Sequence, residues 1–255
     1  MRFFVQPDDV IDGTIRLSKE DSDHIRSLRI RPDEYFIVCD GCGVDYVCRL
    51  GERYGNTIVE ITGQNPSSGE PSVKCRVYIA YSKGDRLDYS VQKSVELGAG
   101  EIILYESERC VAVPRDIPKK ISRLQRIAFE TAKQSGRGIV PVVKAIGNFE
   151  TATSDAIKDS MLSLLFYENE NQLGIKEVLE RYFCQQNGDE VKDIKSVSLI
   201  TGPEGGFAPL EVESAQIKGI KIVSLGPRIL RSETAPIVAL TAVMFHTENL
   251  AHRIR

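Results

Sequence analysis

The chain has 255 residues, of which 42% are hydrophobic and 27% are charged, and its formal net charge is −3. This composition is typical of a folded globular protein of one or two domains, and the sequence has no long Gln, Ser or charge tract. Because the chain has no basic excess, a global positive field is excluded, and any surface for nucleic acid must be a local patch.

Residues 1–72 are predicted to form a small β-barrel domain that ends in a linker. Short runs of strand-forming residues alternate with turn signals, and Asp40-Gly41 between two such runs is typical of a β-hairpin. A helix is predicted over residues 18–29, with Ser18 as its N-cap. A polar stretch rich in Pro, Gly and Ser, residues 64–72, marks the linker. The predicted strands cover residues 3–5, 35–39, 44–50 and 57–61.

The first residues turn acidic before a signal-peptide core is complete, and no apolar run is long enough to cross a membrane, so we expect a cytoplasmic protein. The six cysteines are then expected to be reduced thiols. Cys39 and Cys42 have the spacing of a zinc-finger pair. No second pair closes that site and no histidine lies at ligand spacing, so we expect no metal.

Residues 73–255 show a strand–helix alternation that predicts an α/β domain with a mostly parallel sheet and helices on both faces. The predicted strands or extended segments cover residues 73–81, 101–105, 140–144, 161–167, 197–200 and 220–224. The predicted helices cover residues 86–97, 119–134, 149–158 and 235–250.

The helix predicted over residues 119–134 has a charged stripe that is mostly basic. Lys119, Arg123, Arg126 and Lys133 share this stripe with one acid, Glu130. A solvated face is the usual meaning of such a stripe. Its basic excess in an acidic protein equally fits contacts with RNA phosphates, so both interpretations stay open.

Two apolar strand runs each end in a glycine-containing loop. The run 197–200 leads into Gly202-Pro203-Glu204-Gly205-Gly206, and the run 220–225 leads into Gly226 and Pro227. Such loops at the carboxyl edge of an α/β sheet present main-chain groups to a ligand. Neither loop has the spacing of a phosphate-binding motif, so a nucleotide polyphosphate is not expected. Glycines that serve local turns only are the alternative.

The sequence leaves single-residue roles in the first of these loops undecided. Glu204 is either a turn or helix-capping residue or a contact to the ligand. Gly205 is expected at a point where the main chain has a positive φ or closely approaches the ligand.

The final helix, predicted over residues 235–250, is apolar nearly all round over its first three turns. A helix without a polar face must be buried, so we expect it to pack under the sheet or against a second subunit.

The GPEGG sequence and the later SLGPRILRSETA sequence resemble the SPOUT class of RNA methyltransferases, and more narrowly the RsmE family. Further matches follow in family order, among them Lys93-Ser-Val-Glu96-Leu97-Gly98 and Ser107-Glu108-Arg109. The resemblance implies a PUA-like β-barrel over residues 1–72 and a SPOUT domain with a C-terminal trefoil knot over residues 73–255. It also implies a homodimer.

The resemblance implies S-adenosylmethionine as cofactor and methylation of uridine N3 in 16S ribosomal RNA, expected within the assembled small subunit. A methyltransferase for another base or for tRNA, and a catalytically silent RNA-binding or ribosome-assembly factor, are the alternatives. The cofactor is expected at Phe166, Tyr167, Thr201, Gly202, Pro203, Gly205, Gly206, Leu225, Gly226, Ile229, Leu230, Ser232 and Thr234.

Arg231 and Glu233 are the expected catalytic residues. Uridine N3 is a poor nucleophile until it loses its proton, and a cation such as Arg231 near the base oxygens would stabilise the resulting anion. An ion pair with Glu233 that braces the loop is an equally open role for Arg231. The general base is either solvent or Glu233. RNA contacts are expected on one surface from Arg29, Lys93, Arg109, Arg123, Arg126 and Arg137.

Overall fold

The computed structural model describes residues 2–31, 33–53, 56–183, 195–247 and 249–250, and it divides into two compact units. Unit 1 comprises Met1–Glu70 and Ala132–Val140, and unit 2 comprises Pro71–Thr131 and Pro141–Arg255. The strand–helix pattern of the sequence predicts residues 132–140 in the second domain instead. They belong to unit 1 because the Cys39 thiol donates to the Gly138 carbonyl at 3.1 Å, and Glu70 binds the Arg137 guanidinium at 2.6 Å.

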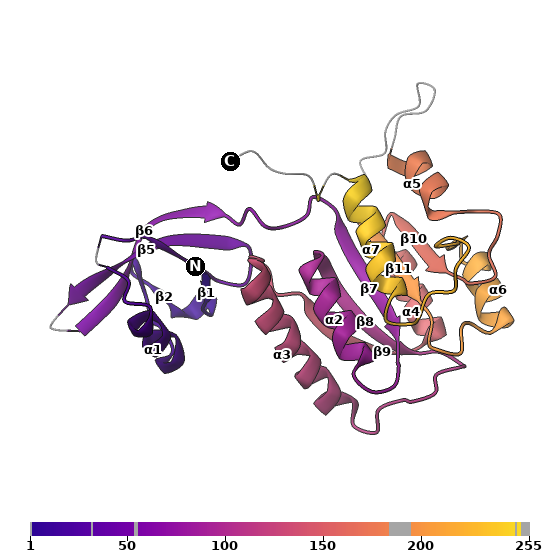
Figure 1. Ribbon diagram of the computed structural model, residues 1–255, viewed down its shortest axis with the longest axis horizontal. Helices are drawn as coiled ribbons and strands as arrows, with labels where there is room; N and C mark the ends of the chain where they lie inside the picture. Colours follow the sequence, from indigo (N-terminus) through magenta and orange to yellow (C-terminus); the bar gives the residue numbers. More distant parts are fainter. Residues whose placement is uncertain (1, 32, 54–55, 184–194, 248, 251–255) are drawn as a thin grey trace. The chain divides into compact units, whose positions relative to one another are not determined.

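Unit 1 contains a curled six-stranded sheet in the order β1-β4-β5-β6-β3-β2, seen in indigo and purple in Figure 1. The β1–β4 pair is parallel and the other pairs are antiparallel. A register shift between Val47 and Cys48 interrupts the long β5–β6 ladder, and such a bulge increases the local twist. The strands are β1 (Arg2–Phe4), β2 (Val10–Ile11), β3 (Thr14–Ile15), β4 (Phe36–Cys39), β5 (Val44–Arg53) and β6 (Asn56–Pro66).

The helix of unit 1, α1, covers Lys19–Ser27, and a short 3-10 helix, η1, covers Pro7–Asp9. The predicted N-cap of α1 is confirmed, because the Ser18 hydroxyl accepts a hydrogen bond from the Asp21 amide at 3.0 Å. Ile25 of α1 is buried in the apolar cluster that fills this unit, where the Phe3 and Phe36 rings meet edge to face at 5.8 Å.

Unit 2 contains a six-stranded parallel sheet in the order β12-β10-β11-β7-β8-β9. Its strands are β7 (Lys74–Ala80), β8 (Ala99–Glu106), β9 (Val142–Asn148), β10 (Leu162–Phe166), β11 (Ser196–Thr201) and β12 (Lys221–Val223). Its helices are α2 (Arg86–Glu96), α3 (Ile117–Ser135), α4 (Phe149–Lys158), α5 (Ile175–Phe183), α6 (Pro209–Ile217) and α7 (Ala235–His246). The predicted α/β alternation is confirmed, whereas α5 and α6 lie where the sequence analysis has no element. The last four residues of α3 belong to unit 1.

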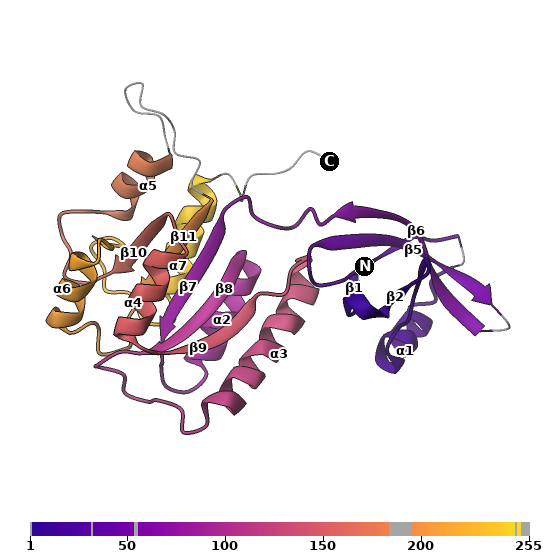
Figure 2. The ribbon, with the colours of Figure 1, turned by 180° about the vertical axis from the view of Figure 1, so that it is seen from behind.

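Helices cover both faces of the parallel sheet. Helices α2 and α7 lie on the face seen in Figure 1, and α4 lies on the face seen from behind in Figure 2. Tyr78 and Ala80 of β7 pack with Ala152 and Ala156 of α4 in one apolar cluster. Because side chains alternate along a strand, the buried residue between them, Ile79, points to the opposite face of the sheet, which α2 and α7 cover.

The apolar final helix α7 packs on the sheet against β7 and β11, and also contacts α2 and α5. Ala239, Leu240, Val243 and Met244 are buried there, which is the first of the two predicted environments. Phe245 at its end keeps 75% of its surface exposed.

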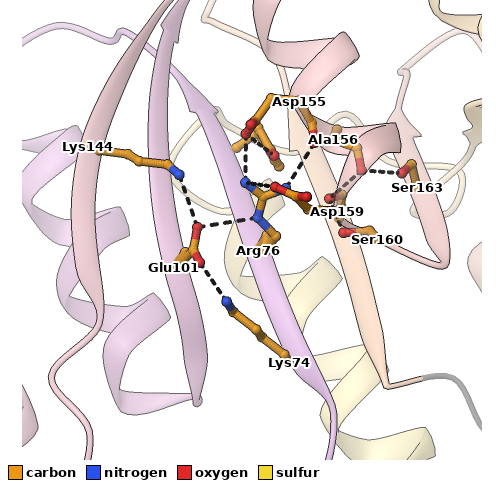
Figure 3. A network of polar contacts seen from close by, with 11 residues as sticks. Lys74, Arg76, Glu101, Lys144, Asp155, Ala156, Asp159, Ser160 and Ser163 are labelled. Carbon is orange, nitrogen blue, oxygen red and sulfur yellow. Dashed lines mark hydrogen bonds and ion pairs between the residues drawn. The ribbon is translucent and has the colours of Figure 1, made fainter. Parts of the chain in front are cut away.

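A polar network lies at the amino end of the sheet and ties α4 to three strands (Figure 3). Arg76 of β7, only 2% exposed, binds the Asp155 carboxylate at 2.7 Å and the Glu101 carboxylate at 3.3 Å. Glu101 of β8 in turn binds Lys74 at 2.6 Å and Lys144 of β9 at 3.2 Å. Ion pairs therefore occupy the amino end of the parallel sheet. Its carboxyl end is free of this network and is the end at which such sheets bind ligands.

Candidate functional site

A cavity of about 550 Å³ lies at the carboxyl edge of the parallel sheet in unit 2. The segments after β10, β11 and β12 and the first residue of α2 form its walls. We call residues 201–206 the first glycine loop and residues 225–234 the second glycine loop. The lining residues are Arg86, Phe166, Tyr167, Glu168, Gly202, Pro203, Glu204, Gly205, Gly206, Ser224, Leu225, Gly226, Arg228, Ile229, Leu230, Arg231, Ser232 and Ala235.

The start of the first glycine loop is pinned to the sheet beneath it. Thr201 is fully buried, and its hydroxyl donates to the Tyr78 carbonyl at 3.1 Å. The Tyr105 hydroxyl donates to the Thr201 carbonyl at 2.8 Å, and burial raises the pKa of this phenol, which stays a neutral donor. The loop therefore leaves the sheet in a fixed direction.

The glycines of this loop are required by the close approach of other protein segments. Gly206 has a φ of +66°, and a Cβ there would lie 2.1 Å from Oε1 of Glu168. Gly205 does not have the positive φ that the sequence analysis allows for it. A Cβ at Gly205 would instead lie 2.9 Å from the Arg109 carbonyl oxygen, so the segment after β8 explains this glycine.

The second glycine loop is open to solvent over most of its length. Gly226 has a φ of +106°, and a Cβ there would have no neighbour within 4 Å. Ile229 keeps 83% of its surface exposed although it lines the cavity. Just before this loop, the Ser224 amide donates to the Leu173 carbonyl at 2.8 Å, which fixes the strand end from which the loop departs.

The structure brings together most of the residues expected to bind the cofactor. All of them except Thr201 and Thr234 line the cavity. Thr201 lies buried beneath the loop, and Thr234 is the N-cap residue of α7, where its amide donates to the Arg231 carbonyl at 2.9 Å. Thr201 therefore supports the cavity from beneath, whereas Thr234 lies next to the lining residue Ala235.

Glu204 has a role that the sequence leaves open. Its Oε1 accepts from the Lys83 amide at 2.9 Å and from the Arg86 guanidinium at 3.0 Å. Burial opposes ionisation, but these hydrogen bonds outweigh it and lower the pKa of Glu204, so the carboxylate is charged. The turn role is confirmed, because the Gly206 amide donates to the Pro203 carbonyl at 3.0 Å across Glu204, whereas Ala208 and Glu211, not Glu204, form the start of α6.

Sequence reasoning misses Arg86, Ser224 and Ala235 among the cavity residues, and of these only Arg86 is charged. It is the first residue of α2, immediately after the segment that follows β7, and its guanidinium lies 3.0 Å from Glu204 and 3.8 Å from Glu233. Its position at a strand–helix junction on the carboxyl edge is a signal that marks it as a candidate.

The two expected catalytic residues differ in exposure. The Arg231 side chain is 80% exposed and lies at the cavity, 4.0 Å from the Glu233 carboxylate, which is 16% exposed. The Arg231 guanidinium is mostly exposed and lies at the limit of an ion-pair distance, so its pair with Glu233 contributes little stability. Glu233 also accepts a hydrogen bond from the Ser232 hydroxyl at 3.3 Å.

The residues expected to contact RNA have different surroundings. In unit 2, Lys93 binds Glu96 at 2.8 Å, Arg123 binds Asp88, and Arg109 donates to the Gly205 carbonyl at 3.4 Å. Exposed Arg126 lines a hollow of about 540 Å³ along α3, together with Asp116, Lys119, Lys120, Ser122 and Arg123.

Unit 1 contains the other two residues expected to contact RNA. Arg29 is exposed and follows α1 with a φ of +51°. Arg137 is only 4% exposed and is bound by Glu70. Burial would raise the pKa of the Glu70 carboxyl, but hydrogen bonds from Arg137 and from neighbouring amides outweigh it and lower that pKa. Because its guanidinium is buried in this pair, we withdraw Arg137 from the expected phosphate contacts.

The described part of the chain has neither a clustered set of metal ligands nor a membrane-spanning helix. There, no three His, Cys, Asp or Glu side chains are grouped so that they could hold a metal ion. None of the helices described is both long enough and apolar enough to span a bilayer.

Comparisons with known proteins identify relatives along nearly the whole chain. Residues 69–244 match the family described as "RNA methyltransferase domain". Ribosomal RNA small subunit methyltransferase E of Bacillus subtilis is similar, with 30% identity over 93% of this chain and 92% of the relative. The structure is similar to that of ribosomal RNA small subunit methyltransferase E from Neisseria gonorrhoeae bound to S-adenosyl methionine, with a TM-score of 0.73, 31% identity and 96% of each chain covered. A probable rRNA-methyltransferase from Porphyromonas gingivalis is also similar, with a TM-score of 0.76, 27% identity, and 98% of this chain and 99% of the other covered.

Proposed function

Because the chain belongs to the RNA methyltransferase family of ribosomal RNA small subunit methyltransferase E, we propose that it methylates N3 of a uridine in 16S ribosomal RNA with S-adenosylmethionine. One observation carries the proposal: two glycine loops form a single cavity in a chain similar to a protein whose structure contains that cofactor. The protein is proposed to act in the cytoplasm on the assembled small subunit.

The cavity fits the cofactor in size and in chemistry. Its volume of about 550 Å³ lies within the range of small-molecule sites. Phe166, Leu225 and Leu230 supply apolar walls, and the glycine loops supply main-chain donors and acceptors at the sheet edge. Oε2 of Glu204 is buried without a hydrogen-bond partner among the described residues, and it would accept from a polar group of the cofactor.

The chemistry asks the chain mainly for positioning and charge. The bound cofactor supplies a methyl group on a positively charged sulfur, and the protein must hold uridine N3 in line with it. Arg231, exposed at the cavity, is proposed to stabilise the anion that forms when N3 loses its proton. Glu233, 4.0 Å from Arg231 and 3.8 Å from Arg86, is proposed to orient Arg231, and solvent accepts the proton.

Arg231→Ala should therefore lower turnover by about 100-fold while RNA affinity changes less than about threefold, the pattern of a contact made mainly in the transition state. Single-turnover methylation and filter binding measure the two quantities. Equal losses of rate and affinity would instead assign Arg231 to RNA binding or loop structure.

Three features of the architecture are part of the proposal. The curled sheet of unit 1 is proposed to be a PUA-like barrel that selects the RNA. Unit 2 is proposed to be a SPOUT domain with a trefoil knot, supported by the Ser224 main chain, which hydrogen-bonds to both Leu173 and Ile175. A homodimer is proposed on the ground that Phe245 of α7 is 75% exposed. Sedimentation at micromolar concentration should give twice the chain mass, and a monomer that still binds the cofactor would contradict the dimer.

The reaction is tested by mass mapping of methylated nucleosides in ribosomal RNA. In cells that lack this protein, 16S RNA should contain one 3-methyluridine fewer than in wild-type cells, and expression of the protein should restore it. Loss of a methyl group from another base or from tRNA would assign a different substrate, and no change in methylation would favour a silent RNA-binding factor.

A further inference from the structure

The Arg86 guanidinium lies between two carboxylates, one from each glycine loop of the cavity. We propose that Arg86 is a positioning residue that fastens the second glycine loop to the first, so that the cavity is already formed when the cofactor enters. This inference rests on the proposed function, since it assigns a role within the same cofactor cavity.

The contacts of Arg86 join three strand-end segments of the parallel sheet. Its Nη1 lies 3.0 Å from Oε1 of Glu204 in the first glycine loop, and its Nε lies 3.8 Å from Oε2 of Glu233 in the second. The Lys83 amide, in the segment after β7, donates to the same Glu204 oxygen at 2.9 Å. Strands β7 and β11 are neighbours, but β10 separates β11 from β12, so the guanidinium connects segments that the sheet does not place side by side.

The second glycine loop depends on this connection. The other side-chain hydrogen bonds and ion pairs of residues 225–234 stay within the loop or reach only Ser224. Within the described residues, the Arg86–Glu233 pair is the one side-chain interaction that joins this loop to another part of the chain. Gly226 hydrogen-bonds only locally, to Ser224, a Cβ at Gly226 would have no neighbour within 4 Å, and Ile229 is 83% exposed. By contrast, the first loop is held by Tyr78, Tyr105 and Arg109.

The chemistry of arginine suits this task. A planar guanidinium presents donors in several directions and can bind two carboxylates at once, whereas a lysine ammonium on a flexible stem acts as a point charge. Both carboxylates are shielded, with side-chain exposures of 18% for Glu204 and 16% for Glu233. A loop held in its binding conformation has less freedom to lose when the ligand binds, and this raises affinity.

The test is calorimetric titration of the full-length protein with S-adenosylhomocysteine. Arg86→Met should weaken binding by about tenfold, equivalent to about 1.4 kcal/mol, and Arg86→Lys should recover part of the loss. Glu233→Gln should weaken binding less than Arg86→Met, and adding it to Arg86→Met should cause little further loss. Arg16→Met is the matched control, because it removes an Arg–Asp pair of 3.0 Å outside the cavity.

Two further measurements distinguish positioning from a general structural role. At saturating S-adenosylmethionine, Arg86→Met should regain most of its turnover, since the defect is in the KM for the cofactor. Amide hydrogen exchange in residues 225–232 should become faster in this variant while exchange in unit 1 is unchanged. If Arg86→Met does not fold, Arg86→Lys and Glu233→Gln carry the same comparison.

The outcomes separate this inference from the proposed function. If the wild type does not bind S-adenosylhomocysteine, the proposed function fails. If the wild type and Arg86→Met bind S-adenosylhomocysteine equally tightly, only the positioning role fails. Where Arg86→Met does not fold, equally tight binding by Arg86→Lys and Glu233→Gln has the same meaning. A loss of RNA affinity with unchanged cofactor affinity would make Arg86 a contact to RNA and would also overturn the inference.

Discussion

Single residues in the first glycine loop are constrained by protein neighbours before any ligand is considered. Gly206 combines a φ of +66° with a Cβ position that Glu168 already occupies. Glu168 is flexible and can rotate away, but it lines the cavity, so its displacement would change the space offered to the cofactor. The backbone conformation of the loop and the space in the cavity therefore both depend on Gly206.

Gly206→Ala should weaken S-adenosylhomocysteine binding by about tenfold or more and destabilise the fold by about 1–3 kcal/mol through backbone strain. Adding Glu168→Ala should return part of the affinity by removing the clash. Gly219→Ala is the matched control: its φ is +87° and nothing lies within 4 Å of its Cβ position, so it isolates the strain. Calorimetry and denaturant unfolding measure both effects, and unchanged affinity in Gly206→Ala would contradict this explanation of the loop.

At the scale of elements, β7, β8, β9 and α4 are held by the network of Figure 3. Burial would raise the pKa of Glu101, but hydrogen bonds from Lys74 and Lys144 outweigh it and lower the pKa to about 2. The folded-state pKa lies below the reference value of 4.5, so Glu101 stabilises the fold above pH 4.5 and loses this contribution as the pH falls through about 2.

Glu101→Gln should therefore lower the free energy of unfolding at neutral pH by about 1–2 kcal/mol. The full pKa shift of Glu101 would correspond to about 3 kcal/mol, and the partial exposure of both lysines reduces it. The difference should shrink as the pH falls from 4.5 towards 2. Urea unfolding at several pH values measures it, with Asp23→Asn, which removes an exposed pair with Arg26, as control. A difference independent of pH would show that packing, not charge, explains the loss.

Helix α3 shows how ion pairs divide a basic stripe. Lys120 and Arg123 bind Asp88, and Lys133 binds Asp21, so part of its positive charge is already neutralised. Lys119 and Arg126 form no ion pair within the described residues, and both line the hollow along α3. These two are the stronger candidates for RNA phosphates.

Arg126→Ala should reduce the slope of log affinity against log salt by about one, because one phosphate contact is lost. Arg123→Ala should change it less, since Asp88 already pairs with Arg123. Filter-binding titrations with small subunits measure these slopes, and Lys176→Ala on the exposed face of α5 serves as control. If Arg126→Ala has the same salt slope as the wild type, the basic stripe of α3 is only a solvated face.

For the whole molecule, the sequence predicts the α/β alternation and nearly all of the cavity lining, because strand ends and glycine loops leave local signals. Helix α6 escapes this reasoning because its pattern is inverted: Leu210 and Ile217 are exposed by 73% and 80%, whereas Glu211 is buried. Glu211 accepts hydrogen bonds from the Ser107 hydroxyl and the Glu108 amide, neighbours that only the fold supplies.

The same limit applies to charged residues far apart in the chain. The Arg137–Glu70 pair joins residues 67 positions apart, and the Arg86–Glu204 pair joins residues 118 positions apart. Periodicity and spacing describe neighbours along a helix or strand, so they do not show which distant carboxylate a given arginine meets. The sequence pattern therefore predicts an RNA contact for the buried Arg137 and does not single out Arg86.

The most direct test of the proposed reaction uses purified components. Small ribosomal subunits from cells that lack this protein are incubated with the full-length protein and methyl-labelled S-adenosylmethionine, and the nucleosides of their 16S RNA are analysed by mass. We predict one labelled 3-methyluridine per subunit with the wild type and, within a single-turnover time, almost none with Arg231→Ala. Label on a different base, or no label with a wild-type protein that binds the cofactor, would contradict the proposed reaction.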